Sequence, residues 1–409
     1  MESKESILNR WFLYKDPKDL SLLEALGKVS EGKLLAKILQ NVPKEQLLLI
    51  CRTSKYIKSI CDKYELIDRL YAGELHVHDS YTGKKNIFKT DQIIQISGAY
   101  DRFAFVTKTG ELYTFGISAF GELGDGNLNL HKIIIPFQIK NIPSVKQVSC
   151  GPSHTGFITT DGDLYTFGNG KYGVLGDAIF GKHKVGIPFK VKNISKVKQI
   201  NCSIGITAFI SENDNLYAFG IFHEFILNPE KQIIYKNVKY ISRNLTFITH
   251  DNNLYKTEVN LYEDQLYLVK KNIFSNVKQL YVSFEKDYSL FVLQNGDLYK
   301  FYNNILKKIE NIHNNVKEIN FDSDSKCAIV TENHDLYTFS IDDYNPVKVK
   351  NIPKVDYVSI GSQKIVFSTK SDFKFDINCQ ICGSVAKYHT DKHLFCGREC
   401  FNEFYSFDK

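Results

Sequence analysis

The sequence is poor in tryptophan, methionine, proline and arginine, and it has no long hydrophobic run. One Trp, one Met and nine Pro occur in 409 residues, and only six of the 52 basic residues are Arg. The longest apolar stretches, such as 47–51, are far shorter than the ~18 residues that cross a bilayer. The first residues (MESKESILNRW) carry charges where a secretory signal is apolar. These absences predict an intracellular protein, cytoplasmic or nuclear, without a membrane-spanning segment.

The charge balance is only mildly basic. Net charge is +6, and lysine supplies nearly all of the basic residues. Guanidinium groups are the usual partners of phosphates and guanines, so the scarcity of arginine argues against nucleic acid as a partner. With 43% hydrophobic and 24% charged residues, the composition is that of a globular chain with a sizeable core.

The nine cysteines are odd in number and unevenly spread, and the last four lie between positions 379 and 400. Such a distribution argues against a disulfide framework and for reduced thiols with one local cluster. The isolated thiols are expected to be small buried core residues; they are Cys51, Cys61, Cys150, Cys202 and Cys327.

A phrase of Asn-Ile, Val-Lys-Gln and an apolar residue recurs along most of the chain. It reads KNIPSVKQV at 140–148, KNISKVKQI at 192–200 and KNIFSNVKQL at 271–280, with more degenerate copies before and after. A period of ~40–50 residues indicates a repeat architecture. Intervals of 52, 52, 41, 39, 39 and 39 residues separate seven anchor positions, which are Ile93, Val145, Val197, Val238, Val277, Val316 and Val355.

Each unit continues with an alternating apolar segment, a turn and a Leu-Tyr-x-Phe segment, as in GFITTDGDLYTFG (156–168) and LFVLQNGDLYKFY (290–302). Alternating β-branched and aromatic residues predict strands, and Asp161-Gly162 and Asn295-Gly296 predict tight hairpins between them. Units of this length with three or four short strands are typical of propeller blades. The sequence therefore predicts a mainly β fold with a seven-bladed β-propeller over 73–378.

The seventh unit lacks an outer strand of its own. Near the start of the propeller, Gly73–Val77 mimics the strand segment 162–166, and Ile87–Lys89 has the pattern of an outer strand. A closed ring must remove its open sheet edges. We therefore expect residues 75–90 to complete the last blade.

The first two units add glycine-rich loops, FGISAFGELGDG at 115–126 and FGNGKYGVLGD at 167–177. These loops, with CGPSHTGFIT at 150–159, resemble the regulator-of-chromosome-condensation repeat family, which implies a β-propeller. The resemblance covers about 75–378, is specific in the first two units and fades after Gly220. Gly168–Gly173 also matches the G-x-G-x-x-G of dinucleotide sites, but no helix and acid follow as that motif requires. We interpret it as a repeat loop.

The last four cysteines form two close pairs, Cys-x2-Cys and Cys-x3-Cys. Four thiolates so spaced suit tetrahedral zinc, and the second pair is expected at the start of a short helix, whose dipole favours thiolates. The segment resembles treble-clef zinc fingers. We predict one structural zinc ion in a finger over 379–409; a disulfide is the alternative, and His389 and His393 either lie at the surface or replace a cysteine. The predicted ligands are Cys379, Cys382, Cys396 and Cys400.

Before the propeller, apolar residues of 42–71 fall at helical spacings, and Thr53-Ser54 reads as a cap between helices. We predict a small α-helical domain over 36–72 and a helical leader over 1–35. The domain resembles an F-box, although Ile67 stands where Trp is common. The resemblance implies that a Skp-type adaptor docks on its apolar face; a helical cap on the propeller is the alternative. The implied adaptor-binding residues are Pro43, Leu47, Ile50, Ile57, Ile60, Leu66 and Leu70.

No supported catalytic constellation is evident. Cys150 near His154 falls at repeat positions that blade packing explains, and fold alone licenses no activity. The sequence predicts a non-enzymatic adaptor that links a propeller-bound target to a Skp-cullin-type ubiquitin ligase, with protein partners and no small-molecule substrate. The alternatives are a guanine-nucleotide exchange or chromatin-associated propeller, and a plain scaffold; no long inserted loop stands out to act on a GTPase.

Overall fold

The computed structural model describes one body of the chain in detail. It describes residues 73–370, except for 223–224, 228–232, 263–264, 283–288, 303–304, 311, 313–315, 322–325, 341–344 and 363. It also describes Tyr56, Ile57, Ser59 and Ile60, and a small sheet of β29 (Tyr388–His389) and β30 (Leu394–Phe395). Gly73–Lys370 forms one compact unit, and Met1–Ala72 with Ser371–Lys409 forms a second. Within these described residues, no helix has the length and apolarity needed to cross a membrane.

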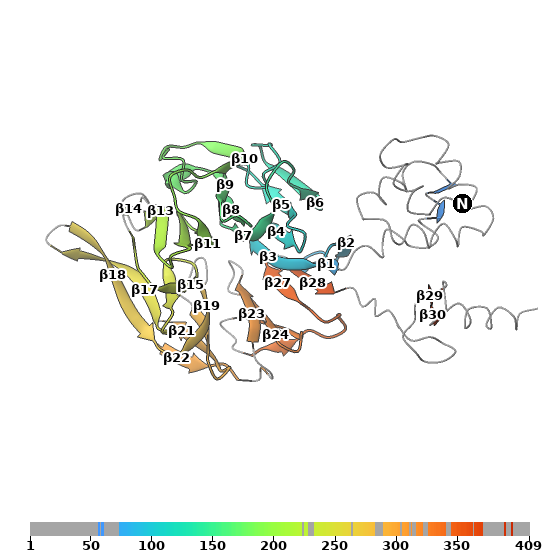
Figure 1. The fold of residues 1–409 in the computed structure, drawn as a ribbon. Coiled ribbons are helices and arrows are strands. Elements are labelled where there is room, and N and C mark those ends of the chain that lie inside the picture. Colours follow the sequence, from blue (N-terminus) through green and yellow to red (C-terminus); the bar gives the residue numbers. More distant parts are fainter. Residues whose placement is uncertain are drawn as a thin grey trace, which may run out of the picture. The chain divides into compact units, whose positions relative to one another are not determined.

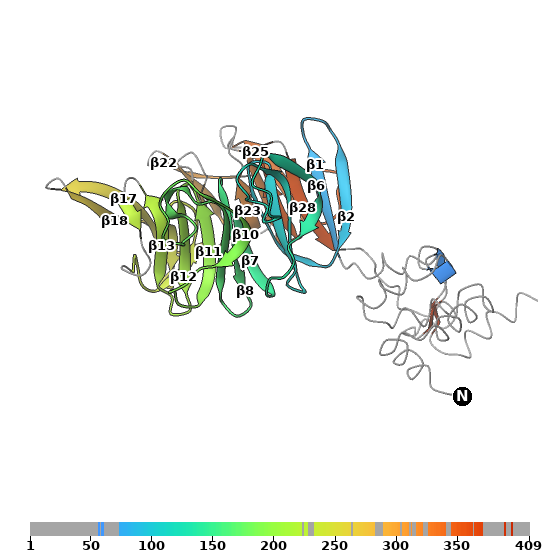
Figure 2. The same ribbon diagram turned by 90° about the horizontal axis from the view of Figure 1, so that it is seen from above.

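The unit Gly73–Lys370 is a ring of seven four-stranded antiparallel sheets (Figures 1 and 2). The predicted seven-bladed propeller is therefore confirmed. The strands of each blade are given from the innermost outwards. Blade 1 consists of β3 (Ile93–Ala99), β4 (Arg102–Thr107), β5 (Leu112–Ser118) and β6 (His131–Gln138), and blade 2 of β7 (Val145–Cys150), β8 (His154–Thr159), β9 (Leu164–Asn169) and β10 (Lys184–Lys190). Blade 3 consists of β11 (Val197–Ser203), β12 (Ile206–Ser211), β13 (Leu216–Phe222) and β14 (Phe225–Leu227), and blade 4 of β15 (Val238–Ile241), β16 (Thr246–Thr249), β17 (Leu254–Tyr262) and β18 (Gln265–Phe274).

The last three blades follow the same order. Blade 5 consists of β19 (Val277–Val282), β20 (Ser289–Leu293), β21 (Leu298–Tyr302) and β22 (Ile305–Lys308). Blade 6 consists of β23 (Val316–Phe321), β24 (Lys326–Thr331), β25 (Leu336–Ser340) and β26 (Val347–Lys348). Blade 7 consists of β27 (Tyr357–Ile360), β28 (Lys364–Lys370), β1 (Gly73–Asp79) and β2 (Lys85–Thr90).

The seventh blade closes the ring with strands from both ends of the unit. Its order is β27-β28-β1-β2, and Leu75 pairs with Ser368 on one side and Phe88 on the other. The prediction that residues 75–90 complete this blade is confirmed. Because the N-terminal strands pair with the C-terminal ones, the ring has no open edge at its seam. The predicted propeller boundary at 378 and the residues 371–378 lie outside the described residues.

The anchor of the recurring Val-Lys-Gln phrase is the first residue of the inner strand in blades 1 to 6, and a β-bulge explains the pattern of the phrase. In blade 2, Val145 pairs with Thr159 but Gln147 pairs with Ile158, so the extra residue is Lys146. The same register shift follows the anchor in blades 1 to 6. A bulge changes the phase of the two-residue alternation. The anchor is therefore buried, the glutamine two positions on faces the axis, and the next apolar residue is buried again.

The Leu-Tyr phrase is explained by aromatic stacking between adjacent strands. In blade 2, Phe157 of β8 pairs with Tyr165 of β9, with ring centroids 5.0 Å apart and planes 2° apart. Blades 1, 3, 4 and 5 repeat this pair with centroid separations of 4.9, 5.3, 5.4 and 6.0 Å. Such pairs contribute about 0.5–1.5 kcal/mol beyond the burial of their area. The phenylalanine of each pair is buried.

The described hydrophobic core of the ring is divided into seven clusters, one between each pair of neighbouring blades. Between blades 1 and 2, for example, Val106, Leu112, Val145 and Phe157 are buried together. The cluster between blades 7 and 1 contains Leu75 of β1 together with residues of β28, β3, β4 and β5. Each blade therefore buries both faces against its neighbours, which is why an isolated unit has no core of its own. Cys150, Cys202 and Cys327 are buried in these clusters, as predicted; Cys51 and Cys61 lie outside the described residues.

Two loop predictions are confirmed and one feature was not anticipated. Gly162 and Gly296 turn with φ of 79° and 88° in tight hairpins, and the Gly168–Gly173 segment forms a loop with a 3₁₀ helix at Lys171–Gly173. The unanticipated feature is the hairpin of β17 and β18, which stays paired as far as Tyr262 and Gln265. It projects beyond the outer edges of the other blades (Figures 1 and 2).

Candidate functional site

Polar side chains from the inner strands form a ring around the propeller axis, two positions after each anchor. Four of them use a side-chain oxygen to accept a hydrogen bond from the backbone N–H of the next blade, so they bridge neighbouring blades. The pairs are Gln95 with Val148 (2.8 Å), Gln147 with Ile200 (3.0 Å), Gln199 with Ile241 (3.1 Å) and Glu318 with Val358 (3.1 Å). Tyr240 takes this position in blade 4.

A second ring lies four positions after each anchor and bridges blades in the same way. The acceptors are short side chains, and the donors are N–H groups of the next inner strand. The pairs are Ser97 with Cys150 (2.9 Å), Ser149 with Cys202 (2.8 Å), Ser242 with Val282 (3.2 Å) and Asn320 with Ile360 (3.3 Å). Tyr281 takes this position in blade 5. Both rings satisfy backbone donors that would otherwise face the axis unpaired.

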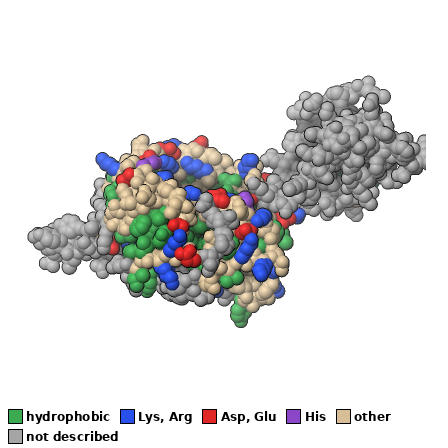
Figure 3. Space-filling model, turned by 90° about the horizontal axis from the view of Figure 1, so that it is seen from below, with side chains coloured by type: hydrophobic (Ala, Val, Ile, Leu, Met, Phe, Trp, Pro, Cys, Tyr) green, Lys and Arg blue, Asp and Glu red, His purple; other side chains and the backbone are tan. Residues whose placement is uncertain are grey.

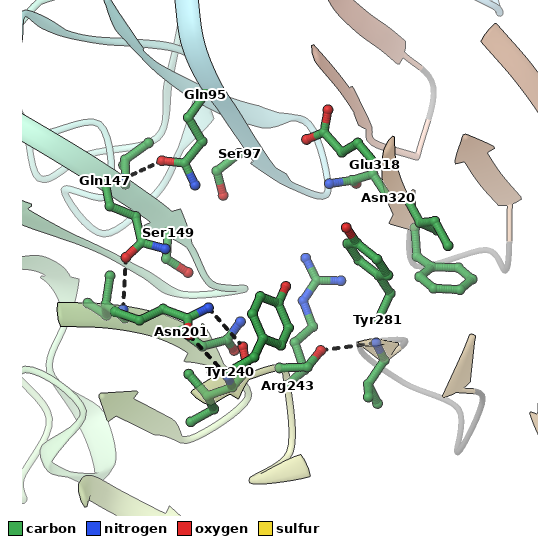
Figure 4. A pocket seen from close by; sticks show the side chains of 18 of the residues that line it. Gln95, Ser97, Gln147, Ser149, Asn201, Tyr240, Arg243, Tyr281, Glu318 and Asn320 are labelled. Carbon is green, nitrogen blue, oxygen red and sulfur yellow. Dashed lines mark hydrogen bonds between the residues drawn. The ribbon is translucent and has the colours of Figure 1, made fainter. Parts of the chain in front are cut away.

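The two rings enclose an axial channel with a cavity of about 180 Å³. Residues of six inner strands or the turns after them line it, all of them in blades 1 to 6. Arg243 and Glu318 are the charged side chains among its lining residues, and Tyr240 and Tyr281 are its aromatic ones besides Phe321. Figure 4 shows the Arg243 guanidinium pointing into the lumen between the rings of Tyr240 and Tyr281. The channel is therefore polar on all sides but asymmetric in charge.

Enclosure by the blades shifts the ionisation of the channel groups. Burial raises the pKa of Glu318 to about 8, although the Val358 N–H and Lys317 act in the opposite direction. Burial lowers the pKa of Arg243 to about 9, opposed by Tyr240 and Cys150. Burial and Glu318 raise the pKa of Tyr240 to about 12, although Arg243 opposes them. Near neutral pH the carboxyl is mostly protonated while the guanidinium stays charged, so the lumen carries net positive charge.

A second candidate site lies on the glycine-rich loops of blades 1 and 2, and a buried ion pair supports it. Arg102 of β4 lies 3.4 Å from Glu122 of the blade 1 loop and donates to the carbonyl of Gly151 in blade 2 at 2.6 Å. Glu122 also accepts from the Ser118 hydroxyl and the Phe120 N–H, at 2.7 Å each. Burial alone would raise the pKa of Glu122, but Arg102 and these donors outweigh it and hold that pKa below its usual value.

The same loop packs on the outer strand of the next blade. Lys184 at the start of β10 donates to the Leu128 carbonyl at 3.1 Å and lies 4.8 Å from the centre of the Phe120 ring. Gly126 N–H donates to the Gly186 carbonyl at 2.9 Å. A Cβ on Gly186 would lie 2.9 Å from Leu128. This close approach joins the two blades into one continuous surface.

This surface exposes large hydrophobic side chains. Leu130 is 75% exposed, Ile135 71% and Ile187 64%. We define the blade 1–2 surface by its exposed apolar residues in the blade 1 loop, β6 and β10, which are Phe120, Leu128, Leu130, Ile134, Ile135, Phe137 and Ile187. Pro136 and Pro188 interrupt β6 and β10, and proline on an edge strand blocks pairing with another strand. Side-chain contacts, rather than added strands, are therefore what this surface offers.

Most of the site residues predicted from the sequence lie outside the described residues. These are the four zinc ligands Cys379, Cys382, Cys396 and Cys400, and Pro43, Leu47, Ile50, Leu66 and Leu70 of the adaptor face. Ile57 and Ile60 have helical backbone and are buried. The strands β29 and β30 lie between the two cysteine pairs.

Cys150 and His154 do not form a nucleophile and its base. Burial raises the pKa of the Cys150 thiol, and its hydrogen-bonding partners are Ser97 and Thr155. His154 is fully buried and its Nε2 lies 2.7 Å from the Thr207 hydroxyl. That hydroxyl donates to the Val174 carbonyl, so His154 Nε2 is the donor to it. Burial, with Arg102, lowers the pKa of His154 to about 3. Both residues hold blades together, as predicted.

The channel residues were missed as a functional feature, although the sequence carries a signal for them. Polar residues recur two and four positions after each anchor, in Gln147 and Ser149 as in Glu318 and Asn320. A second signal is the departure at Arg243. The other blades place small or apolar residues five positions after the anchor, and those residues are Gly98, Cys150, Cys202, Val282, Phe321 and Ile360.

Comparison with known families supports the repeats. The model of the Regulator of chromosome condensation (RCC1) repeat matches residues 109–158 and 161–210, and a second model of this repeat matches 145–174. The chain therefore contains RCC1 repeats, and the matched stretches lie in blades 1 to 3. This agrees with the expectation that the resemblance is specific in the first two units and fades after Gly220.

Curated relatives match over short segments. The ultraviolet-B receptor UVR8 of Arabidopsis thaliana is 32% identical over 117 residues, which are 28% of this chain and 26% of the receptor. The X-linked retinitis pigmentosa GTPase regulator of Homo sapiens is 38% identical over 88 residues, 21% of this chain and 8% of the regulator. The E3 ubiquitin-protein ligase HERC2 of Homo sapiens is 30% identical over 138 residues, 31% of this chain and 3% of the ligase. The chain thus spans about a quarter of UVR8 and less than a tenth of the other two.

Solved structures share the fold. Human WBSCR16 superposes with a TM-score of 0.59 at 15% identity, covering 74% of this chain and all of that one. Prp20p of Saccharomyces cerevisiae also has a TM-score of 0.59 at 15% identity, covering 83% of this chain and 95% of that one. At these identities the likeness shows a common propeller fold.

Proposed function

We propose that this chain is a non-enzymatic protein-interaction protein whose propeller holds a protein target through the blade 1–2 surface. The observation that carries this proposal is the exposure of large apolar side chains there, with Leu130 and Ile135 each more than two thirds exposed. Clustered exposed apolar groups on a rigid scaffold are typical of protein interfaces. On the side shown in Figure 3, basic and acidic side chains are interspersed around hydrophobic ones, which suits protein partners better than a nucleic-acid backbone.

In this proposal the target is linked to a Skp-cullin-type ubiquitin ligase through the F-box-like segment 36–72. The support is the sequence pattern of that segment, and the 30% identity over 138 residues to HERC2, whose name describes an E3 ubiquitin-protein ligase. In this proposal, Leu47 and Ile50 belong to the adaptor face predicted from the sequence. The chain recruits the ligase and does not itself transfer ubiquitin.

Affinity purification of the tagged full chain, with mass spectrometry, tests both halves of the proposal. The wild type is expected to recover an adaptor and a cullin together with a target. Leu47→Asp combined with Ile50→Asp should lose the adaptor and cullin but keep the target. Leu130→Asp combined with Ile135→Asp should lose the target but keep the adaptor, because the two changes lie in different compact units.

Ile305→Asp is the matched control for the target arm. Ile305 lies in β22 of blade 5 and is 67% exposed, as Leu130 and Ile135 are exposed in blade 1. The Ile305→Asp variant should recover the adaptor and cullin as well as the target. A wild-type purification without adaptor would refute the ligase link, and target recovery that survives the Leu130 and Ile135 changes would refute the blade 1–2 surface.

Guanine-nucleotide exchange is the second candidate function. The observation that favours it is the projecting hairpin of β17 and β18, together with relatives named as a GTPase regulator and, for Prp20p, studied for its binding to Gsp1p and histones. It predicts faster nucleotide release from a small GTPase, measured on a panel of GTPases, and a loss of that effect when 258–270 is shortened to a tight turn. A plain scaffold or a chromatin-associated propeller would give neither release nor adaptor recovery.

A further inference from the structure

We propose that the axial channel binds one small oxyanion, of the size of sulfate or a short carboxylate, and that Arg243 is its main ligand. The channel is a built cavity of about 180 Å³. Pockets for drug-sized ligands measure about 300–1,000 Å³, so the channel suits a small ion with a few waters. Arg243 is the cation among the described residues that line it.

Arg243 departs in residue type from the equivalent position of the other blades. Its counterparts in the other blades are small or apolar residues, such as Cys202 and Val282, which are buried between blades. In blade 4 the inner strand ends early, at Ile241. The turn that follows points the Arg243 side chain into the lumen (Figure 4). A long cationic side chain has thus replaced a core residue and faces the cavity.

The turn that positions Arg243 has strained backbone, and packing and a hydrogen bond from β17 stabilise it. Asn244 and Leu245 both have left-handed backbone, with φ of 55° and 49°. Asparagine adopts this region readily, but for leucine it costs about 1–2 kcal/mol. Burial of the Leu245 side chain opposes this cost, and Thr257 donates its hydroxyl hydrogen to the Leu245 carbonyl at 2.9 Å. The fold therefore maintains this turn, and with it the direction of Arg243, at an energetic cost.

The groups around Arg243 are suited to an oxyanion. A guanidinium carries five N–H donors and binds carboxylate and tetrahedral oxyanions through two parallel hydrogen bonds. Two tyrosine hydroxyls and two asparagine amides line the same cavity. Tyr240 belongs to the same blade as Arg243, whereas Tyr281, Asn201 and Asn320 come from the inner strands of other blades. Enclosure by the blades strengthens the attraction relative to bulk water.

The remaining charged groups around the lumen favour the same ligand near neutral pH. Glu318 has a pKa raised to about 8 by burial, so it is mostly neutral and its carboxyl proton is a donor. Lys317 is next to it, and Tyr240, Tyr281 and Tyr357 are the ionisable groups that interact with it. Above about pH 8, Glu318 becomes an anion and is expected to oppose binding of another.

Isothermal titration calorimetry on the full chain tests the site, with sulfate and acetate as probes in chloride buffer at constant ionic strength. Saturable binding near one site per chain is expected for at least one anion; preference for sulfate would indicate a phosphate-like ligand, and preference for acetate a carboxylate. Arg243→Gln should weaken binding at least about tenfold, the effect of losing one charge-assisted hydrogen bond. Lys192→Gln, which removes the same charge from an exposed loop, should bind like the wild type.

Glu318→Gln provides a second test that does not depend on the folding of Arg243→Gln. Four other inner strands already carry glutamine at the equivalent position, so this variant should fold. Between about pH 6.5 and 8 the charge of sulfate and acetate is constant, and Arg243, with a pKa of about 9, stays mostly protonated. Wild-type affinity should therefore fall over this range as Glu318 ionises, whereas Glu318→Gln should keep most of its affinity. The absence of saturable binding in the wild type, equal binding by Arg243→Gln, or the same pH profile in Glu318→Gln would each overturn the proposal.

Discussion

At the scale of single residues, the channel shows how a β-bulge in each of blades 1 to 6, with the polar side chain that follows it, organises the centre of the ring. The bulged lysine turns the following residue, such as Gln147, toward the axis, where it accepts a hydrogen bond from the next blade. Glu318 does the same with a carboxyl group that burial makes difficult to ionise. Its role in bridging blades therefore needs an acceptor oxygen and not a negative charge.

Glu318→Gln is accordingly expected to stabilise the protein at neutral and alkaline pH. The pKa of Glu318 is about 8 in the folded chain and 4.5 when unperturbed. The folded state therefore holds more protons between these values, and wild-type stability falls as pH rises from 4.5 to about 8. The variant should match the wild type below that range and exceed it above by on the order of 5 kcal/mol. Urea unfolding at a series of pH values measures this, and a difference independent of pH would contradict it.

Thr207→Val is expected to destabilise the packing of blades 2 and 3. The Thr207 hydroxyl accepts from His154 Nε2 at 2.7 Å and donates to the Val174 carbonyl at 2.6 Å, and all three groups are buried. Its loss leaves the buried His154 N–H without an acceptor, at a cost of about 1–3 kcal/mol. Thr166→Val is the control, because Thr166 donates to the Leu175 carbonyl and no hydrogen bond to its hydroxyl from a buried histidine is present among the described residues. Chemical denaturation should show the larger loss for Thr207→Val.

At the scale of elements, each blade is stable because it lies between two others. The seven buried clusters span neighbouring blades, so a single sheet has no core, and the seam between blade 7 and blade 1 is as important as any other interface. β1 is the strand that joins the two ends, since it pairs with β28 and β2. The ring is therefore closed by side-chain packing as well as by backbone hydrogen bonds.

Leu75→Ala is expected to weaken this seam. Leu75 is fully buried in the cluster shared by blades 7 and 1, and truncation of such a leucine costs about 2–5 kcal/mol. Hydrogen exchange of the β28 amides should increase more than that of β12, which lies in blade 3. Ile87→Ala in the adjacent β2 is the control, because Ile87 is 56% exposed and such changes stay within about 0.5 kcal/mol. Equal effects of the two changes would contradict a packed seam.

At the scale of the whole molecule, the chain combines a closed ring with a second compact unit made of its two terminal segments. The ring offers two separate features, a polar axial channel and an exposed apolar surface on blades 1 and 2. In the function we propose, the second unit connects that platform to other proteins. If the proposal is correct, target binding and recruitment lie in separate units, and each is expected to be lost by substitution without the other.

The zinc proposal belongs to this scale, because it concerns the second unit. The purified full chain is expected to contain about one zinc ion, as a closed four-cysteine site requires. Cys396→Ser should lose the zinc while the propeller keeps its β-sheet circular dichroism. Cys327→Ala is the control, because Cys327 is buried between blades 5 and 6 and should not affect the metal. A folded wild-type chain without zinc would refute the finger.

The blade number, the turns and the closing strand follow from the sequence alone. The first two are local patterns that repeat: the anchor position recurs seven times, and the hairpin turn with its Leu-Tyr strand recurs in six of the seven units. The closing strands were predictable because the seventh unit lacks an outer strand of its own and residues 75–90 have the pattern of the missing strands. Such features can be predicted from the sequence because the copies of the repeat can be compared with one another.

Tertiary structure alone decided what lies at the axis and on the blade 1–2 surface. Arg243 and Glu318 are separated by 75 positions and belong to blades 4 and 6, and the closing of the ring brings both to one cavity. Leu128 and Gly186 meet because the loop of one blade packs on the outer strand of the next. Local patterns specify strands and turns through nearest-neighbour preferences, whereas cavities and surfaces arise from contacts between distant segments, which are determined only when the ring closes.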